Sequence, residues 1–161
     1  MKLARKLRLL LGLDKTALLS YLEAFLLLGW ARTLLFRKFS KVAPSLGERG
    51  QETGRESDSA LTPSMWRVAH SIQTVSQYTP WDSKCLVRAI AGMKMLERRG
   101  IGSTLYLGTA KDEDGKLIAH AWLRSGSHYI SGAEVMDRFV VVDKFAKSAG
   151  TRSITEVSHD W

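Results

Sequence analysis

The sequence predicts an α+β fold, in which helices are followed by an antiparallel sheet, with a hydrophobic and basic helical arm before them. Apolar residues recur at near-helical spacing between Ser64 and Arg99. After Gly100 the pattern shortens to segments rich in branched and aromatic residues, separated by turn sequences. A composition of 45% hydrophobic and 25% charged residues is typical of a globular protein.

The N-terminal arm, residues 1–44, begins like a signal peptide, but its apolar core is short and Asp14 and Lys15 interrupt it, with no small-residue cleavage site after it. The next segment, Ala17 to Phe36, is about long enough to span a bilayer. It contains Glu23 and Arg32, each of which costs about 2.5–3.5 kcal/mol at a membrane centre. We therefore expect an amphipathic or largely buried helix that packs on the domain, on a partner, or flat on a membrane.

The net charge of +8 is concentrated in residues 1–41. This region contains Lys2, Arg5, Lys6, Arg8, Lys15, Arg32, Arg37, Lys38 and Lys41. Such a basic segment attracts nucleic acid, anionic lipid or an acidic polypeptide. Aromatic residues are not interleaved with the basic run, so we expect no nucleic-acid binding, while peripheral membrane contact through residues 1–41 stays open.

Residues 45–63, "SLGERGQETGRESDSALTP", are polar and contain glycine, which predicts a flexible linker before a domain over residues 64–161. In that domain we expect a helix from Ser64, a break at "TPWDSK", and a helix from Lys84 to Arg99 with Asp82 or Ser83 as N-cap. Strands are expected over residues 104–107, 117–123, 128–130 and 139–142.

Cys85, the only cysteine, falls in the first turn of the second helix, where the helix dipole and unpaired N–H groups favour a thiolate. The main-chain N–H of Cys85 is also suitably placed to donate to an oxyanion. His120 shares a strand face with Ile118 and Trp122, so a sheet packed on the Cys85 helix could aim the imidazole at the sulfur. The alternatives are an inert buried cysteine and a core histidine bonded to a backbone carbonyl.

A lone cysteine cannot form an internal disulfide, which excludes a disulfide-stapled secreted scaffold and favours a cytoplasmic location. The histidines and the cysteine lack the close spacing of zinc ligands, and no glycine-rich phosphate loop is present. We therefore expect neither a metal nor a cofactor.

Two segments carry a family resemblance: "PWDSKCLVRAIAGMKMLERRGIGSTLYLGT" and "AHAWLRSGSHYISG". Together they resemble the stand-alone leader peptidases of lasso-peptide biosynthesis, a branch of the transglutaminase-like cysteine hydrolases. The similarity runs from Pro80 to about Val142 and includes Pro-Trp, Cys-Leu and Ala-His-Ala-Trp. It implies a papain/transglutaminase-like core, in which a helix carrying the cysteine packs on an antiparallel sheet carrying the histidine.

The resemblance implies that Cys85 is the nucleophile and His120 the base of a cysteine peptidase. Its reaction would release the leader from a ribosomally made precursor peptide. A separate leader-recognition protein and an ATP-dependent macrolactam cyclase are the partners that it implies. An acyltransferase or amidase of the same fold, and a non-enzymatic protein that binds membrane or nucleic acid, are the alternatives.

The sequence departs from the family at the third catalytic position. Relatives place an acidic residue about a dozen positions after the histidine, where this chain has Ser131 and Gly132. A hairpin at "RSGS" would set Ser131 across from His120. Glu134 or Asp137 could reach back from the following loop, whereas Asp143, farther along the next strand, is interpreted as a strand-edge charge. We select Asp137 as the third catalytic residue, with a backbone carbonyl or a water as the alternative support for the imidazole.

Overall fold

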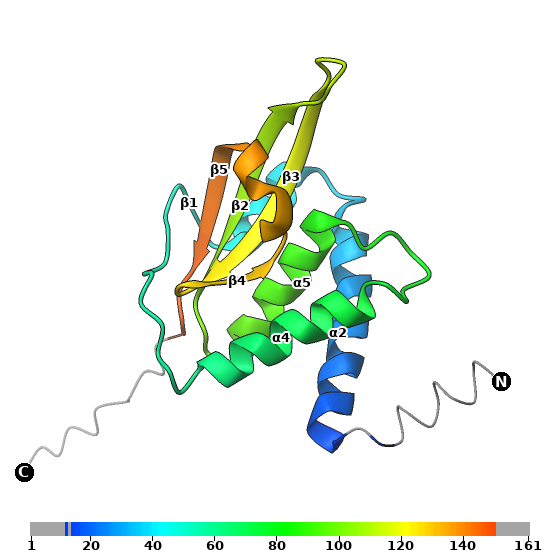
Figure 1. Cartoon of the computed structure of the whole chain (residues 1–161), viewed down its shortest axis with the longest axis vertical. Helices are drawn as coiled ribbons and strands as arrows, with labels where there is room; N and C mark the ends of the chain where they lie inside the picture. Colours follow the sequence, from blue (N-terminus) through cyan, green and yellow to red (C-terminus); the bar gives the residue numbers. More distant parts are fainter. Residues whose placement is uncertain (1–11, 13, 151–161) are drawn as a thin grey trace, which may run out of the picture.

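The computed structural model describes residue 12 and residues 14–150. Three helices, α2 (Lys15–Leu34), α4 (Thr62–Val75) and α5 (Cys85–Arg98), pack with a five-stranded antiparallel sheet of order β1-β5-β2-β3-β4 (Figure 1). The amphipathic helices α4 and α5 precede four of the five strands, and the predicted α+β class is confirmed.

The strands are β1 (Glu48–Arg49), β2 (Ser103–Lys111), β3 (Leu117–Ser125), β4 (His128–Ser131) and β5 (Val140–Lys147). Short helical segments occupy Phe39–Val42 (α3), Ala43–Leu46 (η1) and Ala133–Arg138 (η2). The four predicted strands are present, and each of them is longer than expected. The long β2–β3 hairpin has a register that sets Gly108 directly opposite His120.

Helix α5 packs on the sheet face that carries Ala121 and Leu123, both of which belong to the core. Gly92 allows this close approach, because a Cβ there would lie 3.0 Å from Leu123 Cδ2. Strand alternation places His120 and Trp122 on the other face. The expectation that the face packed on α5 would carry His120 is therefore wrong.

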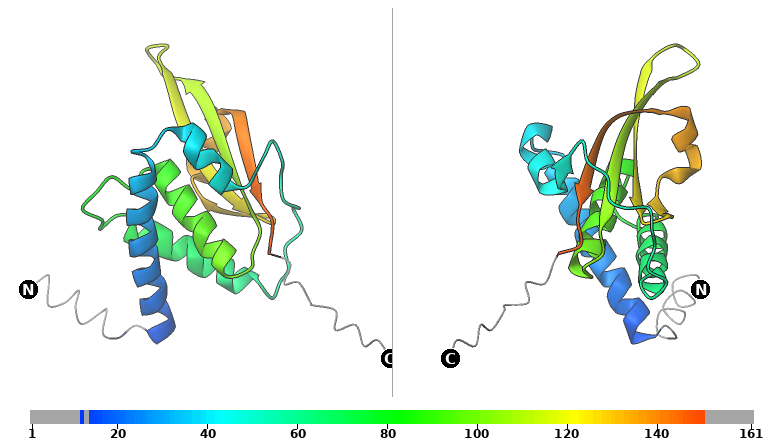
Figure 2. Two further views of the ribbon diagram at one scale, coloured as in Figure 1. Left: turned by 180° about the vertical axis from the view of Figure 1, so that it is seen from behind. Right: turned by 90° about the vertical axis from the view of Figure 1, so that its left-hand side faces the viewer.

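Helix α2 is part of the helical layer and not a separate arm (Figure 2). It buries Ser20, Ala24, Leu28 and Ala31 against α4 and α5. The Glu23 carboxylate lies 3.0 Å from Arg98 Nε and 2.8 Å from Arg99 Nη2. The core thus extends across the boundary expected between residues 44 and 64.

The segment expected to be a flexible linker is docked along the sheet. Glu48 and Arg49 pair with β5. The Thr53 N–H donates to Thr104 Oγ1 at 2.9 Å, and Arg124 Nη1 donates to the Gly54 carbonyl at 3.1 Å. These polar contacts hold a sequence that contains few apolar residues.

Candidate functional site

Cys85 lies in the first turn of α5, as the sequence predicted, and is the first residue of this helix, which was expected to begin at Lys84. The N-cap position is taken by Lys84 in an extended conformation, one residue later than expected, and no side chain caps this helix end. Ser83 instead shares a hydrogen bond of 2.8 Å with Thr79. The first-turn N–H groups therefore keep their donor capacity beside the half-buried, free thiol of Cys85.

Cys85 and His120 border one pocket of about 280 Å³. Its other walls are almost entirely apolar and come from Phe39, Leu86, Leu107, Gly108, Thr109, Ala119, Ala121 and Val142. Strand β4 pairs with β3 only from Leu123 onward, so the outer edge of β3 carries no strand at His120. Cys85 and His120 thus border a common pocket at this open edge, although the His120 side chain starts from the sheet face opposite α5.

The main-chain carbonyl of Gly132 holds the His120 ring. His120 Nε2 lies 2.7 Å from this oxygen, and because a carbonyl only accepts, Nε2 carries the hydrogen. In the neutral ring this tautomer leaves the lone pair on Nδ1. Trp122 and Phe139 pack on the imidazole, with ring centroids 5.9 and 5.0 Å away. The ring is therefore fixed in both orientation and tautomer.

Gly132 is required at its position by both conformation and space. Its φ is +78°, and a Cβ would lie 2.5 Å from the Ala121 carbonyl oxygen. It also stands twelve positions after His120, where the resembled family places an acid. The sequence analysis considered side chains and did not select Gly132. The signal that could have identified it is the "SG" at the position where the resembled family has an acidic residue.

Asp137 lies exposed on η2, and the acceptor at His120 Nε2 is the Gly132 carbonyl. Ser131 pairs with Leu123 and not with His120, because the β3–β4 register shifts between Leu123 and Arg124. Of the three predicted catalytic residues, Cys85 and His120 border one pocket, and Asp137 is not among the residues that line it.

A buried polar cluster supports the His120 face of the sheet, and sequence reasoning missed it. Arg124 is 1% exposed, and its Nε donates to the Tyr106 hydroxyl at 2.9 Å. Burial raises the pKa of Tyr106, which stays protonated and donates to Glu52 at 2.9 Å. The Lys144 ammonium bonds Glu52 and, with Tyr106, lowers the pKa of that carboxyl. The Tyr106 ring stacks on Trp122, and Trp122 packs on His120. The cluster therefore helps to hold Trp122 in place against the imidazole.

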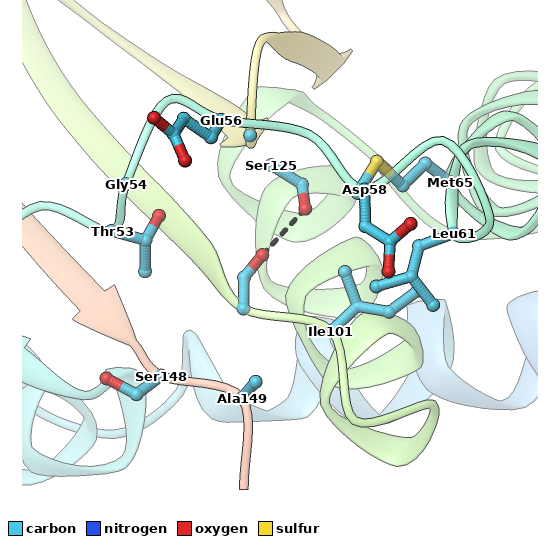
Figure 3. A pocket seen from close by; sticks show the side chains of 12 residues that line it. Thr53, Gly54, Glu56, Asp58, Leu61, Met65, Ile101, Ser125, Ser148 and Ala149 are labelled. Carbon is cyan, nitrogen blue, oxygen red and sulfur yellow. Dashed lines mark hydrogen bonds between the residues drawn. The ribbon is translucent and has the colours of Figure 1, made fainter.

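A second hollow, of about 350 Å³, lies between the docked segment and the ends of β2, β3 and β5 (Figure 3). Glu56 and Asp58 line it, and the Ser125 hydroxyl donates to the Gly102 carbonyl at 2.6 Å inside it. Its lining includes neither a cysteine nor a histidine, so it has no nucleophile and base of the kind at Cys85. Within residues 14–150, no group of three or more His, Cys, Asp or Glu side chains is arranged to hold a metal ion.

The model of one protein family, the transglutaminase-like superfamily, matches residues 24–144. This match starts inside α2, in agreement with the packing of that helix into the core, and it includes Cys85, His120 and Gly132. Neither a curated protein nor a solved structure matches the chain. A family match over this share of the sequence, together with the fold and the shared pocket, shows that the chain belongs to the transglutaminase-like superfamily.

Proposed function

We propose that this protein is a cysteine peptidase that removes the leader from a ribosomally synthesised lasso-peptide precursor. Members of its superfamily are generally cysteine hydrolases or acyltransferases. The finer assignment is supported by the sequence resemblance between Pro80 and Val142. The single observation that carries the chemistry is that Cys85 and His120 border the same pocket.

The proposed mechanism requires His120 Nδ1 to meet the Cys85 thiol at the open edge of β3 and to take its proton, after which the thiolate attacks the carbonyl carbon of the scissile peptide bond. The Cys85 main-chain N–H, at the start of α5, donates to the oxyanion that forms. The imidazolium protonates the leaving nitrogen as the C–N bond breaks, which frees the core peptide with a new amino terminus. Water, activated by His120, then hydrolyses the thioester and releases the leader with a carboxylate end.

The Gly132 carbonyl has the orienting role that a carboxylate has in many cysteine hydrolases. By accepting from Nε2, it selects the tautomer in which Nδ1 is the base. The pocket beside the nucleophile is apolar, so we expect an apolar substrate side chain next to the cleaved bond. The proposed partners are the precursor, a leader-recognition protein and the macrolactam cyclase, in the cytoplasm.

The test is to incubate the purified protein with the precursor and the recognition protein encoded beside it, and to weigh the products. Hydrolysis gives a free leader and a free core whose summed mass exceeds that of the precursor by one water. An acyltransferase would instead attach the leader to an amine without adding water. Cleavage by Cys85→Ala at the wild-type rate would show that this thiol is not the nucleophile, and the proposal would fail.

A further inference from the structure

We propose that the exposed face of α2, together with a basic hollow at its C-terminal end, docks on the surface of an anionic phospholipid membrane. This inference concerns a surface outside the catalytic pocket and does not depend on the peptidase assignment. The exposed face is defined here by Leu18, Leu19, Leu22, Phe25, Leu26 and Trp30.

The arrangement of side chains around α2 points to an apolar environment outside the protein. Three of the four buried positions carry small residues, Ser20, Ala24 and Ala31. The opposite side presents larger apolar residues, among them Leu19 at 65% and Leu26 at 61% exposure. Burial of apolar surface lowers the free energy by about 25 cal/mol per Å². A contiguous apolar face left exposed to water is therefore typical of a site that binds a partner or a membrane.

The charges around this face are complementary to an anionic surface. Lys15 stands at the start of α2, and Arg37, Lys38 and Lys41 follow its end. Glu23, the one acidic residue inside the helix, is turned to Arg98 and Arg99. The sequence before the helix adds Lys2, Arg5, Lys6 and Arg8. Each Lys or Arg held near an anionic leaflet contributes about 1 kcal/mol of attraction.

A hollow of about 340 Å³ is lined by Phe36, Arg37, Lys38 and Lys41. Three cations around one hollow fit a phosphate headgroup, because guanidinium and ammonium groups both bind phosphate oxygens. The Phe36 ring, 80% exposed at the rim, is placed to enter the boundary between headgroups and acyl chains. An acidic protein partner would use the cations as well, but it would not require so large an exposed leucine surface.

The packing of α2 favours docking over spanning. By length and mean hydropathy alone, 1.3 over its best window, α2 could cross a membrane. Crossing would remove Leu28 from the core and break the ion pairs of Glu23. A helix that keeps one side on the protein and lays the other in the interface retains both sets of contacts. Since Phe39 lines the catalytic pocket and Lys38 lines the hollow, docking would hold the catalytic pocket near the membrane.

The experiment is co-sedimentation of the full-length protein with phosphatidylcholine vesicles made with and without phosphatidylglycerol, at low and high salt. We expect binding to the anionic vesicles only, weakened by salt. Leu19→Ser, Leu22→Ser and Leu26→Ser combined should weaken binding about tenfold or more. Arg37→Gln, Lys38→Gln and Lys41→Gln combined should weaken it on the order of a hundredfold.

The matched control replaces two exposed apolar residues elsewhere, Leu117→Ser and Val140→Ser, and should bind as the wild type does. Circular dichroism and thermal unfolding establish that each variant is folded. Absence of vesicle binding by the folded wild type overturns the proposal. So does a leucine variant that binds normally, or a leucine-dependent dimer in light scattering without vesicle binding, which would mean that a second copy covers the face.

Discussion

At the scale of single residues, the site depends on a main-chain oxygen held in place by a glycine. We predict that Gly132→Ala lowers kcat/KM about tenfold or more, because the added Cβ meets the Ala121 carbonyl and moves the acceptor of His120. Gly115→Ala is the matched control, since its φ of +76° is equally strained but no atom lies within 4 Å of the added Cβ. Equal kinetics for the two variants would show that the carbonyl does not position the base.

Cys85 and His120 are predicted to be indispensable to processing and dispensable to folding. Cys85→Ser and His120→Ala should each reduce cleavage by about three to four orders of magnitude, because nucleophile and base act as a unit. His70→Ala is the control, since His70 is an exposed histidine bonded to Tyr21, away from the pocket. Product release measured by mass spectrometry checks the rates. A His120→Ala variant as active as His70→Ala would contradict the assignment of the base.

Asp137, unlike Cys85 and His120, is predicted to be dispensable for processing. The position on His120 Nε2 is filled by Gly132, and Asp137 is exposed on η2. We therefore expect Asp137→Asn to keep the wild-type kcat/KM within about twofold, as is usual for a surface substitution. A loss of about tenfold or more, with the fold intact by circular dichroism, would return Asp137 to the third catalytic position.

At the scale of elements, one carboxylate holds the segment between η1 and α4 on the sheet. Lys144 and Tyr106 lower the folded-state pKa of Glu52 below its ordinary value, so this contact stabilises the docked segment above pH 4.5. The stabilisation is lost as the pH falls through the folded-state pKa. The protection factors for amide hydrogen exchange in residues 48–58, which correct for the slower intrinsic exchange in acid, should fall over this acidic range in the wild type.

In Glu52→Gln the same exchange should be faster at neutral pH and should lack this acid-dependent step. Glu113→Gln, in the exposed β2–β3 turn, is the control and should follow the wild type. If Glu52→Gln showed the full wild-type pH dependence, the docking of the segment would have to depend on another group.

The same segment shows where sequence reasoning succeeds and where it ends. Helix α5 and the strands were predicted because their apolar spacing is local and repeats within a few residues. The docking of residues 45–63 depends on partners far along the chain, such as Glu52 with Lys144 and Thr53 with Thr104. Polar and glycine-containing segments look alike whether they are free or docked, because composition does not reveal such partners.

The candidate site, too, could be predicted from the sequence only in part. Cys85 and His120 could be selected because a thiol at a helix start and an imidazole on a strand have recognisable chemistry. The Gly132 carbonyl has no side chain to select, and its position depends on a register shift between Leu123 and Arg124. The proposed reacting groups, the thiol and the imidazole, can be recognised from residue type. The carbonyl that orients the imidazole can be recognised only from the backbone geometry.

At the scale of the whole molecule, α2 completes the core that supports α5, the helix that carries Cys85. Its inner side contacts both α4 and α5, and Arg99, just past the end of α5, bonds to Glu23. The family match begins within this helix, at residue 24. A protein shortened to residues 64–161 would expose the apolar surface of α4 and α5 that α2 covers.

Two leucines on opposite sides of α2 test this architecture. Leu28→Ala should lower the free energy of unfolding by about 2–5 kcal/mol, because Leu28 is fully buried and its removal leaves a cavity. Leu19→Ala, on the exposed side of the same helix, should change it by less than about 0.5 kcal/mol. Urea unfolding followed by circular dichroism measures both values. Equal, small effects would mean that α2 does not pack on α4 and α5 in solution, and the boundary expected between residues 44 and 64 would be reinstated.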